Sequence, residues 1–478
     1  MQKIKFLSIF LLLFSTAYSQ DNYWSDEYNA GGFLSPGAVI AFNRDSGVFF
    51  YNPALLALTR KSSASISANI YRYESIRIKD GAGIGKNLNS TSTGIVPQMI
   101  SGVIALPGKK PFSLGYALIR SAGFNYQVSQ RQDKKMNVLD DSYSPGDEYF
   151  IGQYSNQNIV SNTQLSLSAG FTLSPKFTAG ISIEPQFRKQ NYFENTDNKT
   201  LLNVNNDSIF PPLVSFGSYY SVNYTHVGIR FKAGFSYNEN NHHLGLLITS
   251  PLLRLWSNAT LLSDITINNI KFVPDAPALS LLANSRQENL KVAWKTPVSV
   301  ALGYTYDYGK GQIYVATEYF SKISQYNAIY PRDGAFLRPD TGNNNNTTQS
   351  TLRLKDAHKQ VINFALGVSF PVKENVYGYC SARTDFTYAD NSLFSDDQGA
   401  TSYTSYWNNY HMQVGANFKK RKFNLRTGLL FTYGHTNSYE QPIDFTNPKD
   451  TNLLLGTPGL TKATHFAVGF MMAYVHNL

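Results

Sequence analysis

The sequence has little of several things that common protein classes require. It contains one cysteine, Cys380, among 478 residues, which excludes an intramolecular disulfide framework, a cysteine-based zinc site and an iron–sulfur cluster. Charged residues make up only 15% of the chain, against roughly 25% in an ordinary soluble domain. Lys and Arg are scattered along the chain, which disfavours a nucleic-acid binder. No run beyond the N-terminus reaches the roughly 18 apolar residues of a membrane helix. A mature chain that crosses a membrane must therefore do so as a closed barrel.

Aromatic residues are what the chain has in excess, with 32 Tyr and 31 Phe against 4 Trp. Apolar and polar residues also alternate with a period of two, as in 164–173 and 226–236. Alternation of this kind places one face of a strand against an apolar phase and the other against something polar or small. The combination is typical of a transmembrane β-barrel with aromatic girdles.

The first 19 residues predict a secretory signal peptide. Lys3 and Lys5 form a positive start, and the apolar run FLSIFLLLF follows over 6–14. Small residues at Ala17 and Ser19 provide a cleavage site before Gln20. We therefore expect an exported protein whose mature chain begins at residue 20.

Fourteen candidate strands follow, and the connections between them alternate strictly between short and long. Short turns on one side and long loops on the other are typical of outer-membrane barrels. We therefore predict an all-β fold: a transmembrane antiparallel β-barrel of about 14 strands, with 12 or 16 left open and both termini periplasmic. The candidate strands are 63–79, 95–106, 111–131, 158–173, 176–193, 217–237, 241–258, 290–307, 311–329, 357–372, 375–390, 404–419, 422–437 and 463–477.

Residues 20–61 precede the barrel and alternate poorly. A barrel of about fourteen strands is too wide to be filled by its own wall side chains. An apolar stretch, GVFFYNPALLAL at 47–58, makes a disordered tail unattractive. We therefore expect 20–61 to fold inside the lumen as an N-terminal plug, or hatch, with the barrel itself spanning 62–478.

The stretch SGVFFYNPALLALTR, residues 46–60, resembles the hatch signature of the FadL/TodX family of outer-membrane hydrophobe transporters. In that family an Asn-Pro-Ala triplet follows a short apolar run and precedes the first strand. Asn52, Pro53 and Ala54 stand at that place here. The resemblance implies passive uptake of hydrophobic small molecules such as long-chain fatty acids or aromatic hydrocarbons. It also implies lateral release into the bilayer through a kink in the third strand.

That third strand, 111–131, is interrupted by the small residues Ser121, Ala122 and Gly123. Glycine inside a strand marks a bulge or bend, so we place the lateral opening there. The alternative is that Gly123 only relieves packing against the plug. Both readings stay open on the sequence alone.

Apolar residues in the third and fourth long loops match the places of the family's ligand-capture loops. The fourth loop contains 276–282, which we expect to form a short helix. The alternative to ligand capture is that the apolar residues of the two loops pack on each other. The capture candidates are Phe210, Leu213, Val214, Leu279 and Leu281. Polar side chains expected to face the lumen, where they pair with a ligand carboxylate or with the plug, are Glu184, Arg188, His226, Arg230, Lys232, Glu318, His411 and Arg426.

No spacing singles out catalytic or metal-binding residues, so we predict no enzyme, no cofactor and no metal. The expected partners are a hydrophobic small molecule, outer-membrane lipid and lipopolysaccharide, and the barrel-assembly machinery, with no nucleic acid and a monomeric state. The expected location is the outer membrane of a gram-negative bacterium. A second reading keeps the barrel but gives it another role: an interaction or shuttle protein of a secretion system, similar to PorV, without small-molecule transport.

Overall fold

The computed structural model describes residues 22–24, 39–42, 50–59, 61–106, 112–120, 123–203, 211–273, 275–338, 347–388, 398–402, 404–405 and 407–478. The predicted signal peptide lies outside these residues, as do Ser121, Ala122 and Phe210. No helix among the described residues is long and apolar enough to cross a membrane.

The described chain is almost entirely strand. The helical pieces are two short 3₁₀ helices, η2 (Pro53–Leu58) and η5 (Asp450–Asn452), and the short α1 (Thr348–Thr351). The strands are β1 (Ser63–Ile78), β2 (Leu88–Leu106), β3 (Phe112–Arg120), β4 (Phe124–Met136), β5 (Glu148–Thr172), β6 (Phe177–Leu201), β7 (Leu213–Glu239), β8 (His242–Thr249), β9 (Leu253–Ile270), β10 (Leu279–Leu290), β11 (Ser299–Tyr308), β12 (Gly311–Phe320), β13 (Ile323–Ile329), β14 (Leu337–Arg338), β15 (Leu354–His358), β16 (Val361–Lys373), β17 (Val376–Asp385), β18 (Asn408–Lys419), β19 (Phe423–Glu440) and β20 (Leu460–Asn477).

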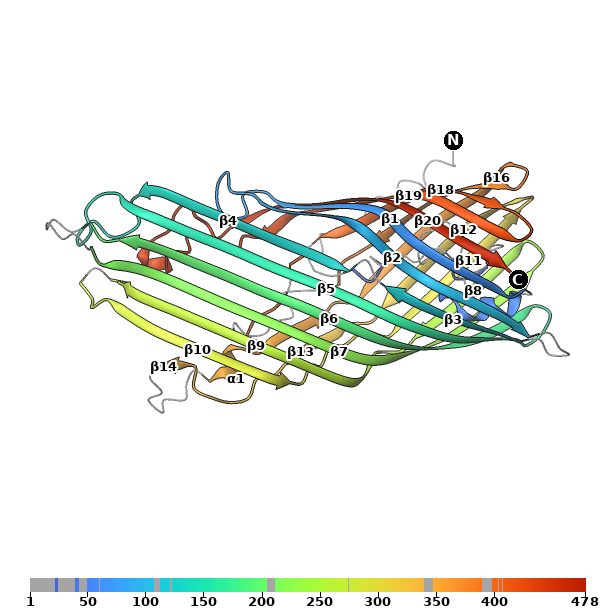
Figure 1. Ribbon diagram of the computed structural model, residues 1–478, viewed down its shortest axis with the longest axis horizontal. Coiled ribbons are helices and arrows are strands. Elements are labelled where there is room, and N and C mark those ends of the chain that lie inside the picture. Colours follow the sequence, from blue (N-terminus) through green and yellow to red (C-terminus); the bar gives the residue numbers. More distant parts are fainter. Residues whose placement is uncertain are drawn as a thin grey trace, which may run out of the picture.

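Fourteen positions around the wall, here called staves and each represented by one strand, close into one antiparallel barrel, as predicted (Figure 1). The seam is the pairing of β1 with β20, which runs from Ser63 opposite Asn477 to Ile78 opposite Ala463. Closure matters because every backbone donor and acceptor in a bilayer needs a partner within the protein. The C-terminus lies at the end of the barrel that carries the tight turns. In order around the barrel, the staves are β1, β2, β3, β5, β6, β7, β8, β11, β12, β16, β17, β18, β19 and β20.

The outward face of the wall carries an apolar belt. On β6 the outward side chains are apolar from Phe177 through Ile181 to Phe187, and they become mostly polar from Lys189 onward. Residues 177–187 have the length of about 9–11 residues with which a tilted strand crosses a bilayer. On β7 the same change occurs near Thr225, the residue paired with Lys189. We call this outward apolar band the membrane belt.

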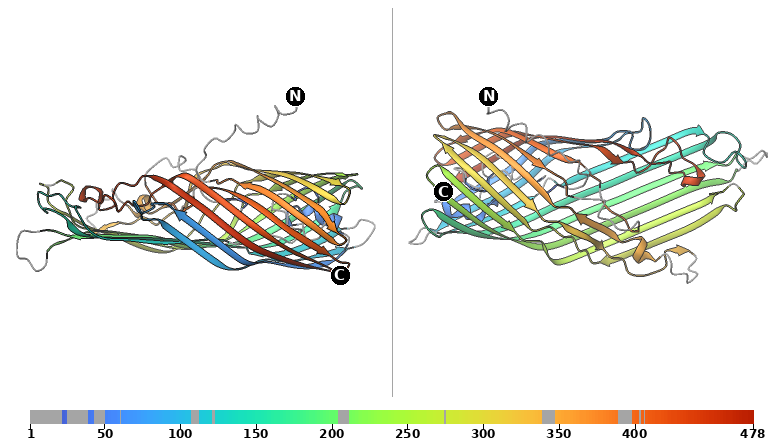
Figure 2. Two further views of the ribbon diagram at one scale, coloured as in Figure 1. Left: turned by 90° about the horizontal axis from the view of Figure 1, so that it is seen from above. Right: turned by 180° about the vertical axis from the view of Figure 1, so that it is seen from behind.

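Six strands continue far past the belt on one side of the molecule. β4 and β10 form the edges of this part, and β5, β6, β7 and β9 lie between them (Figures 1 and 2). We call this continuation of the sheet the extension. It corrects the sequence-based expectation: most of the predicted loops 132–157, 194–216 and 259–289 is strand, and the expected helix at 276–282 gives way to β10, which begins at Leu279.

Candidate functional site

The described parts of the N-terminal segment lie against the inner face of the wall. Asn52 caps η2, because its Oδ1 accepts a hydrogen bond of 3.0 Å from the backbone of Ala54. Its Nδ2 donates to the carbonyl of Ile40 at 2.7 Å and to that of Phe235 on β7 at 3.2 Å. One amide thus fixes the helix start, the preceding turn and a wall strand together. The Asn-Pro-Ala triplet at 52–54 therefore forms the joint by which the N-terminal segment is bonded to the wall.

Glycines in the wall make this close approach possible. Gly170, Gly180 and Gly234 are paired neighbours on β5, β6 and β7, and they form one row beneath residues 52–57. A Cβ at Gly180 would overlap the backbone of Pro53 and Ala54. A second pair, Gly245 on β8 and Gly303 on β11, lies beneath Ile40 and Ala41 in the same way. The wall and the segment therefore touch backbone to backbone, with no room for a side chain between them.

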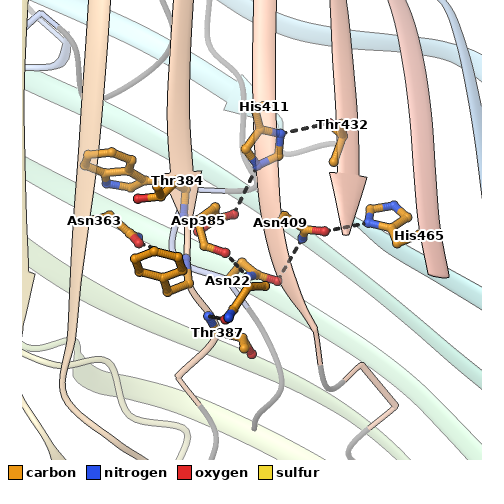
Figure 3. A network of polar contacts seen from close by, with 12 residues as sticks. Asn22, Asn363, Thr384, Asp385, Thr387, Asn409, His411, Thr432 and His465 are labelled. Atoms are coloured by element: carbon orange, nitrogen blue, oxygen red, sulfur yellow. Dashed lines mark hydrogen bonds and ion pairs between the residues drawn. The ribbon is translucent and has the colours of Figure 1, made fainter. Parts of the chain in front are cut away.

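A second anchor lies at residues 22–24, on the opposite wall (Figure 3). Asn22 donates to the carbonyl of Asp385 on β17 and accepts a hydrogen bond of 3.0 Å from Asn409 on β18. The backbone of Trp24 donates to the Asp385 carboxylate at 2.9 Å. His411 and His465 extend the network, reaching Asp385 and Asn409 respectively.

Between these anchors lies a cavity of about 290 Å³ inside the barrel. The N-terminal segment contributes Trp24, Ile40 and Phe50 to its lining. β12 contributes the aromatic side chain of Phe320, and the connection between β10 and β11 contributes that of Trp294. Its apolar part suits a small hydrophobic molecule, and its polar part belongs to the charged groups of the wall.

Most of the predicted lumen charges gather at this cavity. Arg188, Arg230, Lys232 and Glu318 line it. Glu184 is fully buried behind them and pairs with Arg230 at 2.7 Å and with Lys232 at 2.9 Å.

Two of these groups also contact the N-terminal segment. Lys232 lies 4.4 Å from the centre of the Phe50 ring, and Glu318 accepts a 2.7 Å hydrogen bond from the Trp24 indole. Arg426 is buried on β19 and does not line the cavity. His226 is also away from the lining; it packs edge-on against Trp294.

The third predicted strand is broken where the sequence places its small residues. β3 ends with Arg120 opposite Thr163, and β4 begins with Phe124 opposite Val160. Three residues of this strand therefore face two residues of β5, as in a β-bulge. Gly123 has a φ of 70°, and its Cα lies so close to the Val160 carbonyl that a Cβ would overlap it.

The wall loses a ladder at this break. β2 pairs with β3 only from Leu106 to Met99, and among the described residues no ladder joins the rest of β2 to β4. Single side-chain bonds cross instead, such as Ser90 accepting from the backbone of Gln127. Gly123 and Phe124 line the cavity, so the break and the cavity meet.

The described capture candidates lie far from this cavity. Leu213, Val214, Leu279 and Leu281 lie on the strand ends of β7 and β10 in the extension. Val214 and Lys232 are 18 positions apart on β7, which is about 60 Å along a strand at roughly 3.3 Å per residue. Val214 is buried in an apolar cluster with Phe216 and Ile270. The described capture candidates therefore do not form one site with the luminal cavity.

A polar cluster in the extension was missed by the sequence interpretation. Tyr154, Tyr192 and Glu194 meet on its inner face. The spacing of Tyr192 and Glu194 by two residues places them on one face of a strand. That signal is present in the sequence, but the predicted strand ends at 193, one residue before Glu194.

Comparison with known proteins gives matches at the level of structure. A Pseudomonas aeruginosa FadL homologue superposes with a TM-score of 0.54 at 13% identity, over 97% of this chain and 99% of its own. The Ralstonia pickettii toluene transporter TbuX matches with a TM-score of 0.54 at 13% identity, over 95% and 99%. The Pseudomonas putida toluene transporter TodX matches with 0.52 at 11% identity, over 95% and 100%. No protein-family model and no curated protein matches the sequence.

These likenesses cover nearly the whole of both chains, so the resemblance read from the hatch sequence is confirmed for the fold. At 11–13% identity the comparison defines the architecture alone. The structure therefore has the architecture of a FadL-type barrel of fourteen strands.

Proposed function

We propose that this protein is an outer-membrane channel for the passive uptake of hydrophobic small molecules, such as long-chain fatty acids or aromatic hydrocarbons. The observation that carries the proposal is the meeting of the luminal cavity with the broken third strand at Gly123 and Phe124. An apolar molecule in the cavity has a short path through the wall at that point, next to the polar edge of the membrane belt, where Ser161 of β5 pairs with Lys189 of β6. Two of the similar structures are described as toluene transporters, which supports the same class of cargo.

In this proposal residues 20–61 are the plug. The joint at Asn52 and the anchor at Asn22 hold the segment across the lumen, so ions and water do not pass freely. The short-turn end of the barrel, which carries the C-terminus, faces the periplasm. The extension faces outward and brings ligand toward the cavity.

The lateral exit is tested by deleting Gly123. The deletion leaves two residues facing two between Arg120 and Phe124, so the strand returns to one continuous register with β5. Inward residues stay inward, because they are odd-numbered in β3 and even-numbered in β4. We expect uptake of a labelled fatty acid or toluene, per inserted barrel, to fall at least tenfold while binding to the purified protein persists.

Deletion of Gly146 is the matched control. This glycine lies in the connection between β4 and β5, and a Cβ added to it would have nothing within 4 Å. The deletion should leave uptake unchanged. Wild-type uptake by the Gly123 deletion would overturn the lateral exit. The plug is tested separately: removal of 20–60 should raise ion conductance in planar bilayers, and unchanged conductance would contradict it.

A further inference from the structure

A second cavity, of about 370 Å³, lies in the extension, past the membrane belt. Its lining is rich in one aromatic residue type. Five tyrosines take part: Tyr126, Tyr154, Tyr192, Tyr220 and Tyr439. They come from β4, β5, β6, β7 and β19, so distant parts of the chain combine to build this space.

Two acidic residues, Glu194 and Glu440, line the cavity, and the carboxylate of Glu194 lies among these rings. The hydroxyl of Tyr154 donates to its Oε1 at 2.9 Å, and the hydroxyl of Tyr192 donates to its Oε2 at 3.2 Å. The side chain is enclosed by the wall but touches the cavity. Burial raises the pKa of Glu194 above its ordinary value, and the two tyrosine hydrogen bonds act in the opposite direction.

Glu194 has no cation to balance it. Among the described residues, no Lys, Arg or His forms an ion pair with its carboxylate. The stretches 204–210, 339–346 and 389–397, which lie outside the described residues, contain no Lys, Arg or His in their sequence. This differs from Glu184 in the barrel, which pairs with two cations. A half-buried carboxylate without a cation carries a desolvation cost, and such groups concentrate at functional sites.

We propose that this cavity is a binding site for an organic cation, a quaternary ammonium or an alkylammonium. Tyrosine rings attract such cations through their negative faces, and several rings around one cation form an aromatic cage. Each oxygen of Glu194 accepts one tyrosine hydrogen bond and keeps further acceptor capacity for the ligand. The site is separate from the apolar cavity in the barrel, and it stands whether or not the protein transports hydrophobes.

The test is calorimetric titration of the full mature chain in detergent micelles. Choline is the probe, and 3,3-dimethyl-1-butanol is its neutral counterpart of similar shape. We expect choline to bind, the neutral alcohol to bind at least tenfold more weakly, and Glu194→Gln to lose at least tenfold in choline affinity. Lowering the pH through the pKa of Glu194 should weaken choline binding in the wild type, because the protonated carboxyl no longer attracts a cation.

Asp197→Asn is the matched control. Asp197 lies three positions along β6, on the outward face, and pairs with Lys199. It should bind choline like the wild type. Heat-modifiable gel mobility checks folding in each variant, and Glu194→Gln should be at least as stable as the wild type without ligand. Absence of choline binding, equal affinity for the neutral alcohol, or wild-type affinity in Glu194→Gln would overturn the proposal.

Discussion

The belt portion of the wall and the extension share β5, β6 and β7 but have different surroundings. β6 runs without interruption through both, and its pairing with β7 continues from Phe177 to Leu201. In the belt portion the outward side chains are apolar and the inner face is covered by the N-terminal segment. In the extension the outward side chains are mostly polar, and the inner face carries tyrosines around a cavity. Backbone pairing therefore sets the length of a strand, and the surrounding medium sets its pattern.

Charge follows the same division. In the belt portion, Glu184 is fully buried and neutralises Arg230 and Lys232. In the extension, the Asp197–Lys199 pair is more than one-third exposed. We expect Glu184→Gln to destabilise the barrel by about 3 kcal/mol, because it leaves two enclosed cations with one neutral partner. Lys199→Ala should cost about 0.5 kcal/mol or less. Denaturant unfolding of the micelle-bound protein measures both, and equal losses would contradict the comparison.

The outward face gives a second contrast. Ile181 lies near the middle of the membrane belt, and Asn195 lies outward on the same strand in the extension. Ile181→Arg should cost about 2–4 kcal/mol in lipid, since a charge there faces hydrocarbon. Asn195→Arg should change the unfolding free energy little. Folding titrations into lipid vesicles measure the difference, and a tolerated arginine at 181 would mean that the belt is misplaced.

The inner face gives the smallest effect on stability and the clearest effect on permeation. Gly180→Val should leave the barrel folded but displace residues 52–54, because the new side chain occupies the space of Pro53. Channel conductance should rise. Gly217→Val, on the extension part of β7, is the control: an added Cβ there has only Thr266 nearby, at 4.0 Å. Identical conductance in both variants would separate the glycine row from plug docking.

The belt portion was predictable from the sequence, and the extension was not. Alternation between apolar and polar residues exists where one face meets lipid, and it identified all fourteen staves. Past Lys189 both faces of β6 are largely polar, so the pattern fades while the hydrogen-bonded ladder continues to Leu201. The helix prediction at 276–282 was wrong for a related reason. Its leucines resemble a helix face when the partner strand β9 is unknown.

The candidate site residues also divide into some that were predictable from the sequence and others that were not. The strand break at Gly123 was visible because small residues interrupt a strongly alternating strand. The gathering of Arg188, Arg230 and Lys232 followed from their inward spacing on β6 and β7. The contacts of Asn22 and Trp24 with Asp385 join residues more than 360 positions apart, and no local pattern encodes such a pairing.

The break in the third strand rests on one surplus residue, and this has a consequence for how the protein can change over generations. A substitution alters a side chain but never the count of residues between Arg120 and Phe124, which face Thr163 and Val160. Point mutations can therefore reshape the lining of the gap freely, and restoring the ladder requires a change in residue count, either a deletion here or an insertion in β5 opposite. In the proposed channel, substitutions can therefore change the preference for one cargo over another while the interruption of the wall itself is inherited intact.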